Sequence, residues 1–336
     1  MKTALPPRMC RALIALIVLA GVPLLACQVP VFRYALERWN ADRYQVFVVH
    51  SDPLDADAQL AVKALQAAAD AENSRATIDV TVADLSQTET QIPAAVRRAF
   101  EAGKKTPTMY AYYPTANGVG RTVPMHSCEL NKRGVEVLLD SPVRRQVCRR
   151  LQQGDSAVWI FVPCGREKDD QAALKRLEDQ IAADAEWLQL PTPEELEVAP
   201  EVLTKVKVPL QITFSTVVLQ RDDPAEKFLL QSLLNSEDDL TGFDQPLAFP
   251  VFGRGRVLYA LVGQGIAGDT VRSASSFMAG PCSCQVKNQN PGFDLLLQAD
   301  WDKALGDVLI SEPIESVDKE ALAPKLLTIP PGRNRK

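Results

Sequence analysis

The chain has 336 residues, of which 46% are hydrophobic and 24% are charged, and its formal net charge is −5. This composition is typical of a folded globular protein and excludes a disordered chain, a collagen and a multi-span membrane protein. At about 100 to 200 residues per domain, the length indicates two domains, each large enough to bury a core of its own.

Residues 1–26 have the pattern of a secretory signal peptide. Lys2, Arg8 and Arg11 form a positive start, and residues 12–26 form an uncharged apolar run of 15 residues. A membrane-spanning helix needs about 20 apolar residues, so this run is short for one. We therefore expect the segment to direct export and then to be removed.

The export segment ends in Leu24-Leu25-Ala26-Cys27, which resembles the lipobox of bacterial lipoproteins. The resemblance implies that Cys27 is lipidated and that the mature protein is anchored to the cell membrane on its extracytoplasmic, periplasmic side, without a spanning segment. Leu25 is less usual at its place in that motif. The alternative is ordinary cleavage near Ala26, which leaves Cys27 as a plain thiol.

Removal of residues 1–26 takes away three basic and no acidic residues, which changes the net charge from −5 to −8. Nucleic-acid affinity comes largely from Lys and Arg side chains that neutralise phosphates. An acidic mature chain therefore argues against a nucleic-acid partner.

Residues 27–43 are expected to hold the anchor and a docking helix, because Val31, Ala35 and Leu36 share a helical stripe. A first series of elements then follows in residues 44–152. Strands are predicted at 44–50, 76–83, 108–113 and 121–125, helices at 56–72, 93–102 and 142–151, and a turn at 117–118. Ser141 is the expected N-cap of the last of these helices.

A similar series follows in residues 156–305. Strands are predicted at 157–163, 209–219, 247–252 and 257–262, and helices at 169–188, 223–234 and 270–279. The continuous apolar run at 157–163 is expected for a strand that is buried on both faces. Two similar periods imply a duplicated unit. The proline-bearing segment 306–336 is expected to be a loosely ordered tail.

Residues 249–256 (FPVFGRGR), with the strand and helix after them, resemble the closing half of the thioredoxin fold. Thr106-Pro107-Thr108 in the first series is similar, with Pro107 at the place of that family's cis-proline. The resemblance implies an α/β protein of two tandem thioredoxin-like domains, each with a central mixed sheet flanked by helices. Separately, residues 29–39 and 282–287 resemble a family of exported bacterial proteins to which no function is attached.

The redox chemistry of thioredoxins needs Cys-x-x-Cys after the first strand, because a nucleophilic thiolate requires a resolving thiol within reach. In the first series the corresponding residues are His50-Ser51-Asp52-Pro53, without a cysteine. In the second they are Cys164-Gly165-Arg166-Glu167, with a single cysteine. The sequence therefore excludes ordinary dithiol exchange within either motif.

Cys164 is the candidate catalytic residue. It follows a strand and precedes a helix, where the helix dipole and Arg166 would both favour a thiolate. Such a thiolate suits a single-cysteine redox role. The alternative is an incidental thiol at a decayed site.

Cys282 and Cys284 can close a small strained disulfide or supply two thiolates to a soft metal. His126 and Cys128 form a second close pair, so these four residues are the candidate ligands of a Cu(I) or Zn(II) site if the two units face each other. A structural disulfide among Cys128, Cys282 and Cys284 is the favoured reading. Cys148 is expected to be a buried core thiol.

No cofactor is expected. Residues 263–268 match the glycine pattern of dinucleotide-binding proteins, but a Rossmann unit needs a further parallel strand ending in an acidic residue, and a cysteine-bearing loop follows here instead. The glycines are better explained as the end of a hairpin.

Two eroded redox motifs favour a protein that acts through binding or assembly with a protein partner that the sequence does not identify. Two alternatives from other classes stay open. One is a thiol-disulfide oxidoreductase that uses Cys164 with Cys282 or Cys284, and the other is soft-metal binding.

Overall fold

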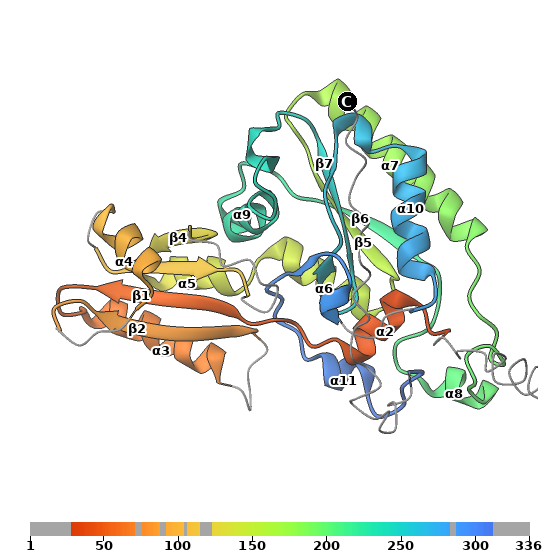
Figure 1. Cartoon of the computed structure of the whole chain (residues 1–336), viewed down its shortest axis with the longest axis horizontal. Helices are drawn as coiled ribbons and strands as arrows, with labels where there is room; N and C mark the ends of the chain where they lie inside the picture. Colours follow the sequence, from red (N-terminus) through yellow and green to blue (C-terminus); the bar gives the residue numbers. More distant parts are fainter. Residues whose placement is uncertain are drawn as a thin grey trace, which may run out of the picture.

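The structure is a computed structural model, which describes residues 28–70, 76–87, 92–103, 106–114, 123–282 and 287–311. In these residues the chain forms two lobes, each built on one mixed β-sheet flanked by helices (Figure 1). The protein therefore belongs to the α/β class, as the sequence predicted. The predicted export segment, Cys27, the predicted turn at 117–118, Cys284 and residues 312–336 lie outside the described part of the chain.

The smaller lobe holds a four-stranded sheet in the order β2-β1-β3-β4. Its strands are β1 (Tyr44–His50), β2 (Ile78–Asp84), β3 (Thr108–Tyr112) and β4 (His126–Glu129). β1 is parallel to β2 and antiparallel to β3, and β3 is antiparallel to β4. Helices α3 (Ala56–Ala69) and α5 (Lys132–Leu139) pack on one face of this sheet, and α4 (Ala94–Glu101) packs on the other.

The larger lobe holds a second sheet in the order β10-β8-β7-β5-β6, with β9 also paired to β7. Its strands are β5 (Ala157–Val162), β6 (Phe214–Val218), β7 (Leu247–Phe252), β8 (Arg256–Val257), β9 (Leu261–Val262) and β10 (Phe293–Asp294). β5 is parallel to β6 and antiparallel to β7. The four strands β6-β5-β7-β8 thus repeat the order and directions of the first sheet.

Helices cover both faces of the second sheet. They are α6 (Pro142–Gln152), α7 (Glu167–Trp187), α8 (Pro200–Lys205), α9 (Lys227–Leu234), α10 (Gly268–Ala279) and α11 (Trp301–Leu305). α7 and α10 lie on one face, and α6, α9 and α11 lie on the other (Figure 1).

Strand β5 is buried on both faces, as its continuous apolar sequence predicts. Trp159 and Phe161 point into the core beneath α7 and α10, whereas Val158 and Ile160 point into the core beneath α6 and α9. All six residues of the strand are buried. Successive side chains of a strand face opposite sides, so only a sheet covered by helices on both faces can use such a sequence.

Pro250 lies inside β7, opposite Trp159. Its carbonyl accepts a hydrogen bond from the Leu258 backbone N–H at 3.1 Å. The nitrogen and the carbonyl of one strand residue point to the same side, so the Pro250 nitrogen also faces the segment around Leu258. Because proline has no N–H to donate, the pairing of β7 with this segment lacks a hydrogen bond at Pro250. The strand predicted at 257–262 is accordingly interrupted and forms the short strands β8 and β9.

Three further details of the first lobe differ from expectation. The fourth strand is β4, which begins at His126, after the predicted range 121–125. Helix α5 was not predicted, although Asn131 caps it by accepting a hydrogen bond from the Gly134 backbone N–H at 2.8 Å. The peptide bond before Pro107 is trans, because the described residues contain no cis peptide bond.

The predicted docking helix is α2 (Val31–Arg38), and it packs against β7 and α10 of the larger lobe. Seven of its eight residues are buried, including Arg33 and Glu37. The Glu37 carboxylate accepts hydrogen bonds from Arg33 Nε at 2.6 Å and from the Ser311 backbone N–H at 2.7 Å. The chain is therefore packed as far as Ser311, beyond the expected start of the tail at Gly306.

The two lobes share a packed interface. The Tyr44 and Phe228 rings lie 6.0 Å apart, and the Tyr113 hydroxyl donates to the Ser232 carbonyl at 2.6 Å. Arg144 is buried and donates to the carbonyls of Leu138 and Leu296, one on each side of this interface. Burial lowers the pKa of Arg144 to about 10.

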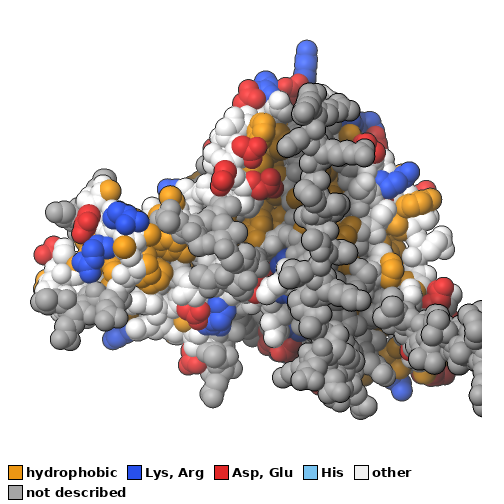
Figure 2. Space-filling model, viewed as in Figure 1, with side chains coloured by type: hydrophobic (Ala, Val, Ile, Leu, Met, Phe, Trp, Pro, Cys, Tyr) orange, Lys and Arg blue, Asp and Glu red, His pale blue; other side chains and the backbone are white. Residues whose placement is uncertain are grey.

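Acidic and basic side chains are interspersed over the described residues of the face drawn in Figure 2, with hydrophobic side chains between them. Within the described residues, no helix is both long enough and apolar enough to cross a membrane.

Candidate functional site

Cys164 lies in the turn between β5 and α7, where its side chain is partly exposed. The turn is shaped by Gly165, whose φ of 88° lies in the left-handed region that favours glycine. Asp170, in the first turn of α7, accepts the Cys164 backbone N–H at 2.7 Å and the Gly165 backbone N–H at 2.9 Å. A carboxylate therefore occupies the backbone donors of this turn.

This arrangement changes the expected chemistry of Cys164. The sequence suggested that the positive end of the helix dipole, together with Arg166, would favour a thiolate. In the structure the two N–H groups of the turn point to Asp170, which also brings a negative charge to the same turn. The backbone N–H groups of the turn therefore bind the Asp170 carboxylate and not the Cys164 thiol.

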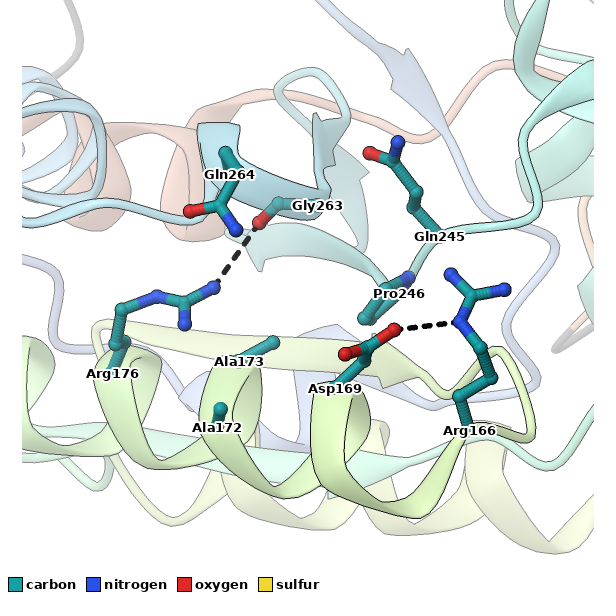
Figure 3. Close-up of a pocket in the computed structure, with 9 residues that line it drawn as sticks. All are labelled: Arg166, Asp169, Ala172, Ala173, Arg176, Gln245, Pro246, Gly263 and Gln264. Atoms are coloured by element: carbon teal, nitrogen blue, oxygen red, sulfur yellow. Dashed lines mark hydrogen bonds and ion pairs between the residues drawn. The ribbon is translucent and has the colours of Figure 1, made fainter.

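Arg166 does not serve Cys164 in the way the sequence suggested. Its guanidinium pairs with Asp169 at 2.6 Å (Figure 3) and with Asp244 at 3.2 Å. The hydrogen bond to Asp169 is the main cause that raises the pKa of Arg166, and Cys164 contributes less. The charge of Arg166 is therefore shared among exposed carboxylates.

A polar pocket of about 210 Å³ lies beside this turn, between α7 and the segment that leads into β7 (Figure 3). Its second arginine, Arg176, donates to the carbonyls of Ile266 at 3.1 Å and Gly263 at 3.4 Å. Both arginines of the pocket are thus hydrogen-bonded to groups of the protein, and neither guanidinium points into the pocket without such a partner.

A larger cavity of about 660 Å³ opens on the other side of Cys164, between α7 and β6. Its apolar lining comes from Phe161, Pro163, Leu174 and Val218, and Val218 is 40% exposed. The Cys164 turn therefore borders an open cavity whose lining is partly apolar.

The corresponding turn of the first lobe follows β1. Here the His50 ring approaches the Asp52 carbonyl through Nδ1 at 2.9 Å, and the turn holds no thiol. Neither lobe therefore places two cysteines at its strand-to-helix turn.

His126 and Cys128 lie on β4 and are both packed. The His126 ring lies 5.3 Å from the Phe228 ring, and burial lowers the pKa of His126 to about 4. Burial also raises the pKa of the Cys128 thiol to about 11, so this thiol is protonated at neutral pH. Cys128 is a free thiol and is not part of the structural disulfide that the sequence favoured.

Cys282 lies at the far end of the larger lobe from Cys164. α10 runs beside α7 in the same direction (Figure 1), because Arg176 contacts the Ile266 carbonyl just before α10 begins, whereas Asp184, further along α7, pairs with Arg272 within α10. Cys282 follows the end of α10, whereas Cys164 precedes α7, whose 21 residues span about 30 Å. Disulfide formation requires Cα atoms within about 7 Å, so the structure does not bring Cys164 and Cys282 together.

The candidate metal ligands are also separated. His126 and Cys128 belong to the smaller lobe, whereas Cys282 is buried in the core of the larger lobe beside α2. No group of three or more His, Cys, Asp or Glu residues among the described positions could hold a metal ion. Cys148 is a buried core thiol, as predicted, and burial raises its pKa to about 12.

Sequence reasoning missed Asp170, although acidic residues in the first turn of a helix are a known signal for capping of backbone N–H groups. It also missed the cavity between α7 and β6, because the positions of exposed strand edges are not visible in a single sequence. In comparisons with protein-family models and with curated proteins, the chain has no match.

Proposed function

We propose that the mature protein is an exported, lipid-anchored pair of thioredoxin-like units that acts by binding or assembly and does not catalyse dithiol exchange. The observation that carries this proposal is the turn after β5. Its single cysteine has no second thiol in the turn, and a carboxylate occupies the neighbouring backbone N–H groups.

The repeated strand order supports the thioredoxin-like part of the proposal. Each sheet has a parallel pair, an antiparallel third strand beside the first, and an antiparallel fourth strand. Helices connect the strands in the order expected from the resemblance. A fold of this kind hosts many activities, so function has to be argued from the site.

The anchoring part can be tested separately. Cys27 directly precedes the described chain, and Cys27→Ala removes the only residue that the motif would lipidate. We expect this variant to move from the membrane fraction to the soluble extracytoplasmic fraction. Unchanged fractionation would contradict lipid anchoring.

The absence of thiol catalysis is tested on the purified mature protein. We expect Cys164 to react with iodoacetamide at the rate of an ordinary exposed thiol, and Cys164→Ser to remove the fraction that reacts at this rate. Cys128→Ser is the matched control, because the Cys128 thiol is half-buried and burial raises its pKa to about 11. A Cys164 that reacts many times faster, or that is recovered in a mixed disulfide with a partner, would overturn the proposal.

A further inference from the structure

Among the strands that the structure describes, β6 is an outer strand of the second sheet and pairs with β5 alone. The Thr213 carbonyl accepts from Ser156, and the Leu219 N–H donates to Phe161, so these residues turn their backbone groups toward β5. Backbone groups of neighbouring residues in a strand point to opposite sides. The N–H and C=O groups of residues 214, 216 and 218 therefore face away from the sheet.

Two cavities lie along this outer edge, and together with the face of α7 that lines them they are called the groove below. The cavity of about 660 Å³ lies at one end of β6, and a second cavity of about 580 Å³ lies at the other, against residues 212–216. One face of α7 lines both cavities. Its residues there include Glu167, Asp170, Leu174, Glu178, Ile181 and Ala185. A strand laid beside β6 would place alternate side chains in this groove.

The groove has an acidic lining. It contains four carboxylates, namely Glu167, Asp170, Glu178 and Asp222, and two guanidinium groups, Arg150 and Arg221. Both guanidinium groups are already paired with backbone carbonyls. Arg221 donates to Pro163 at 2.8 Å, and Arg150 donates to Thr216 at 2.7 Å. These hydrogen bonds orient the guanidinium groups toward the protein and leave their charge in place, so the four carboxylates still outnumber the two positive groups, which complements a basic ligand.

The pairing of Arg150 is informative. The Thr216 carbonyl is one of the outward-facing groups of β6, and it is the acceptor that an added strand would use. Proteins commonly shield exposed strand edges with charged side chains, which suppresses uncontrolled pairing. A guanidinium on a side chain can move away, so this edge is shielded reversibly.

We propose that the outer edge of β6 binds an extended, basic segment of a partner protein by strand addition, with alternate apolar side chains of that segment in the groove beside α7. This inference rests on the binding role proposed above and names the chemistry of the partner. A second copy of the chain fits less well, because an edge-to-edge pair would bring two acidic grooves together.

The probe is a seven-residue peptide that alternates valine with lysine, compared with the same peptide carrying glutamate for lysine. We expect the basic peptide to bind at least about tenfold more tightly than the acidic one. We also expect amide hydrogen exchange to slow at Phe214, Thr216 and Val218, whose N–H groups face outward.

Thr216→Pro tests the edge directly. Residue 216 donates no hydrogen bond to β5, so proline there should spare the β5–β6 ladder while blocking strand addition. Val82→Pro is the matched control, since it removes an outward N–H from β2, the outer strand of the first sheet. Thermal unfolding and circular dichroism establish that both variants are folded.

We expect Thr216→Pro to weaken peptide binding about tenfold or more and Val82→Pro to leave it unchanged. Equal binding by Thr216→Pro, protection of other amides, or no binding of the basic peptide would overturn the proposal. A dimer in solution that Thr216→Pro dissociates would overturn it in favour of a second copy. A Cys164-dependent thiol activity would instead contradict the proposed function, without changing the result at β6.

Discussion

At the scale of single residues, Asp170 determines the backbone hydrogen bonding and the local charge of the Cys164 turn. Its two carboxylate oxygens accept one N–H each, from Cys164 and Gly165. Hydrogen bonds to a charged acceptor are stronger than those between neutral groups. The same carboxylate therefore orders the turn and brings its own negative charge to it.

Asp170→Ala should accordingly have two effects. Loss of both hydrogen bonds should destabilise the protein by about 1–3 kcal/mol, as urea unfolding would measure. Loss of the negative charge should increase the alkylation rate of Cys164 at fixed pH. Glu167→Ala, a nearby acidic change outside these hydrogen bonds, is the control. A slower or unchanged alkylation rate would contradict this account of the turn.

His126 gives the fold a defined pH dependence. Burial lowers its pKa to about 4, whereas the unfolded chain titrates near 6.5, so the unfolded state binds the proton first as pH falls. Stability is therefore complete above about pH 6.5 and is lost as the pH falls toward 4, by at most about 3 kcal/mol.

His126→Asn removes this titration and can still approach Gln231, the hydrogen-bond partner of the imidazole. Between pH 7 and pH 4, we expect the unfolding free energy of the wild type to fall by up to about 3 kcal/mol more than that of the variant. Parallel pH profiles for the two proteins would show that His126 is not held neutral.

At the scale of elements, the strands of the second sheet were easier to predict than its irregular parts. The continuous apolar run of β5 and the N-cap at Ser141 were both predicted and are both confirmed. The interruption between β8 and β9 was not predicted, because it depends on which neighbour Pro250 faces. The sequence shows that Pro250 has no N–H to donate, but it does not show which neighbouring strand loses that hydrogen bond.

Helix α2 shows a similar limit. Its apolar stripe predicted a docking helix, but the structure buries it almost all round. Burial of Arg33 and Glu37 is possible because they pair with each other and because residues 310 and 311, some 270 positions away, donate to Glu37. A contact between the two ends of the described chain has no local signal in the sequence.

Glu37→Ala tests how much this contact contributes. It leaves the Arg33 guanidinium buried without its carboxylate, so we expect a loss of about 3–5 kcal/mol in urea unfolding. Asp179→Ala breaks an exposed pair with Lys175, also spaced i,i+4, and should cost less than about 1 kcal/mol. Similar losses for the two variants would contradict a structural role for α2.

At the scale of the whole molecule, the repetition of one strand order in two sheets was foreseen, and the arrangement of the sites was not. Cys164 and Cys282 share one lobe but lie at opposite ends of it, and His126 faces the interface between the lobes. Cysteine spacing in a sequence carries no such distances. The candidate thiol could therefore be identified from the sequence, whereas its separation from Cys282 and from the cysteine of the smaller lobe could not.

The most direct test of the central claim is the rate at which the purified mature protein reduces a protein disulfide such as that of insulin, with excess dithiol as reductant. We predict that the wild-type rate equals that of Cys164→Ser and that neither exceeds the rate with the dithiol alone. An acceleration by the wild-type protein that Cys164→Ser abolishes would contradict a binding role without thiol catalysis.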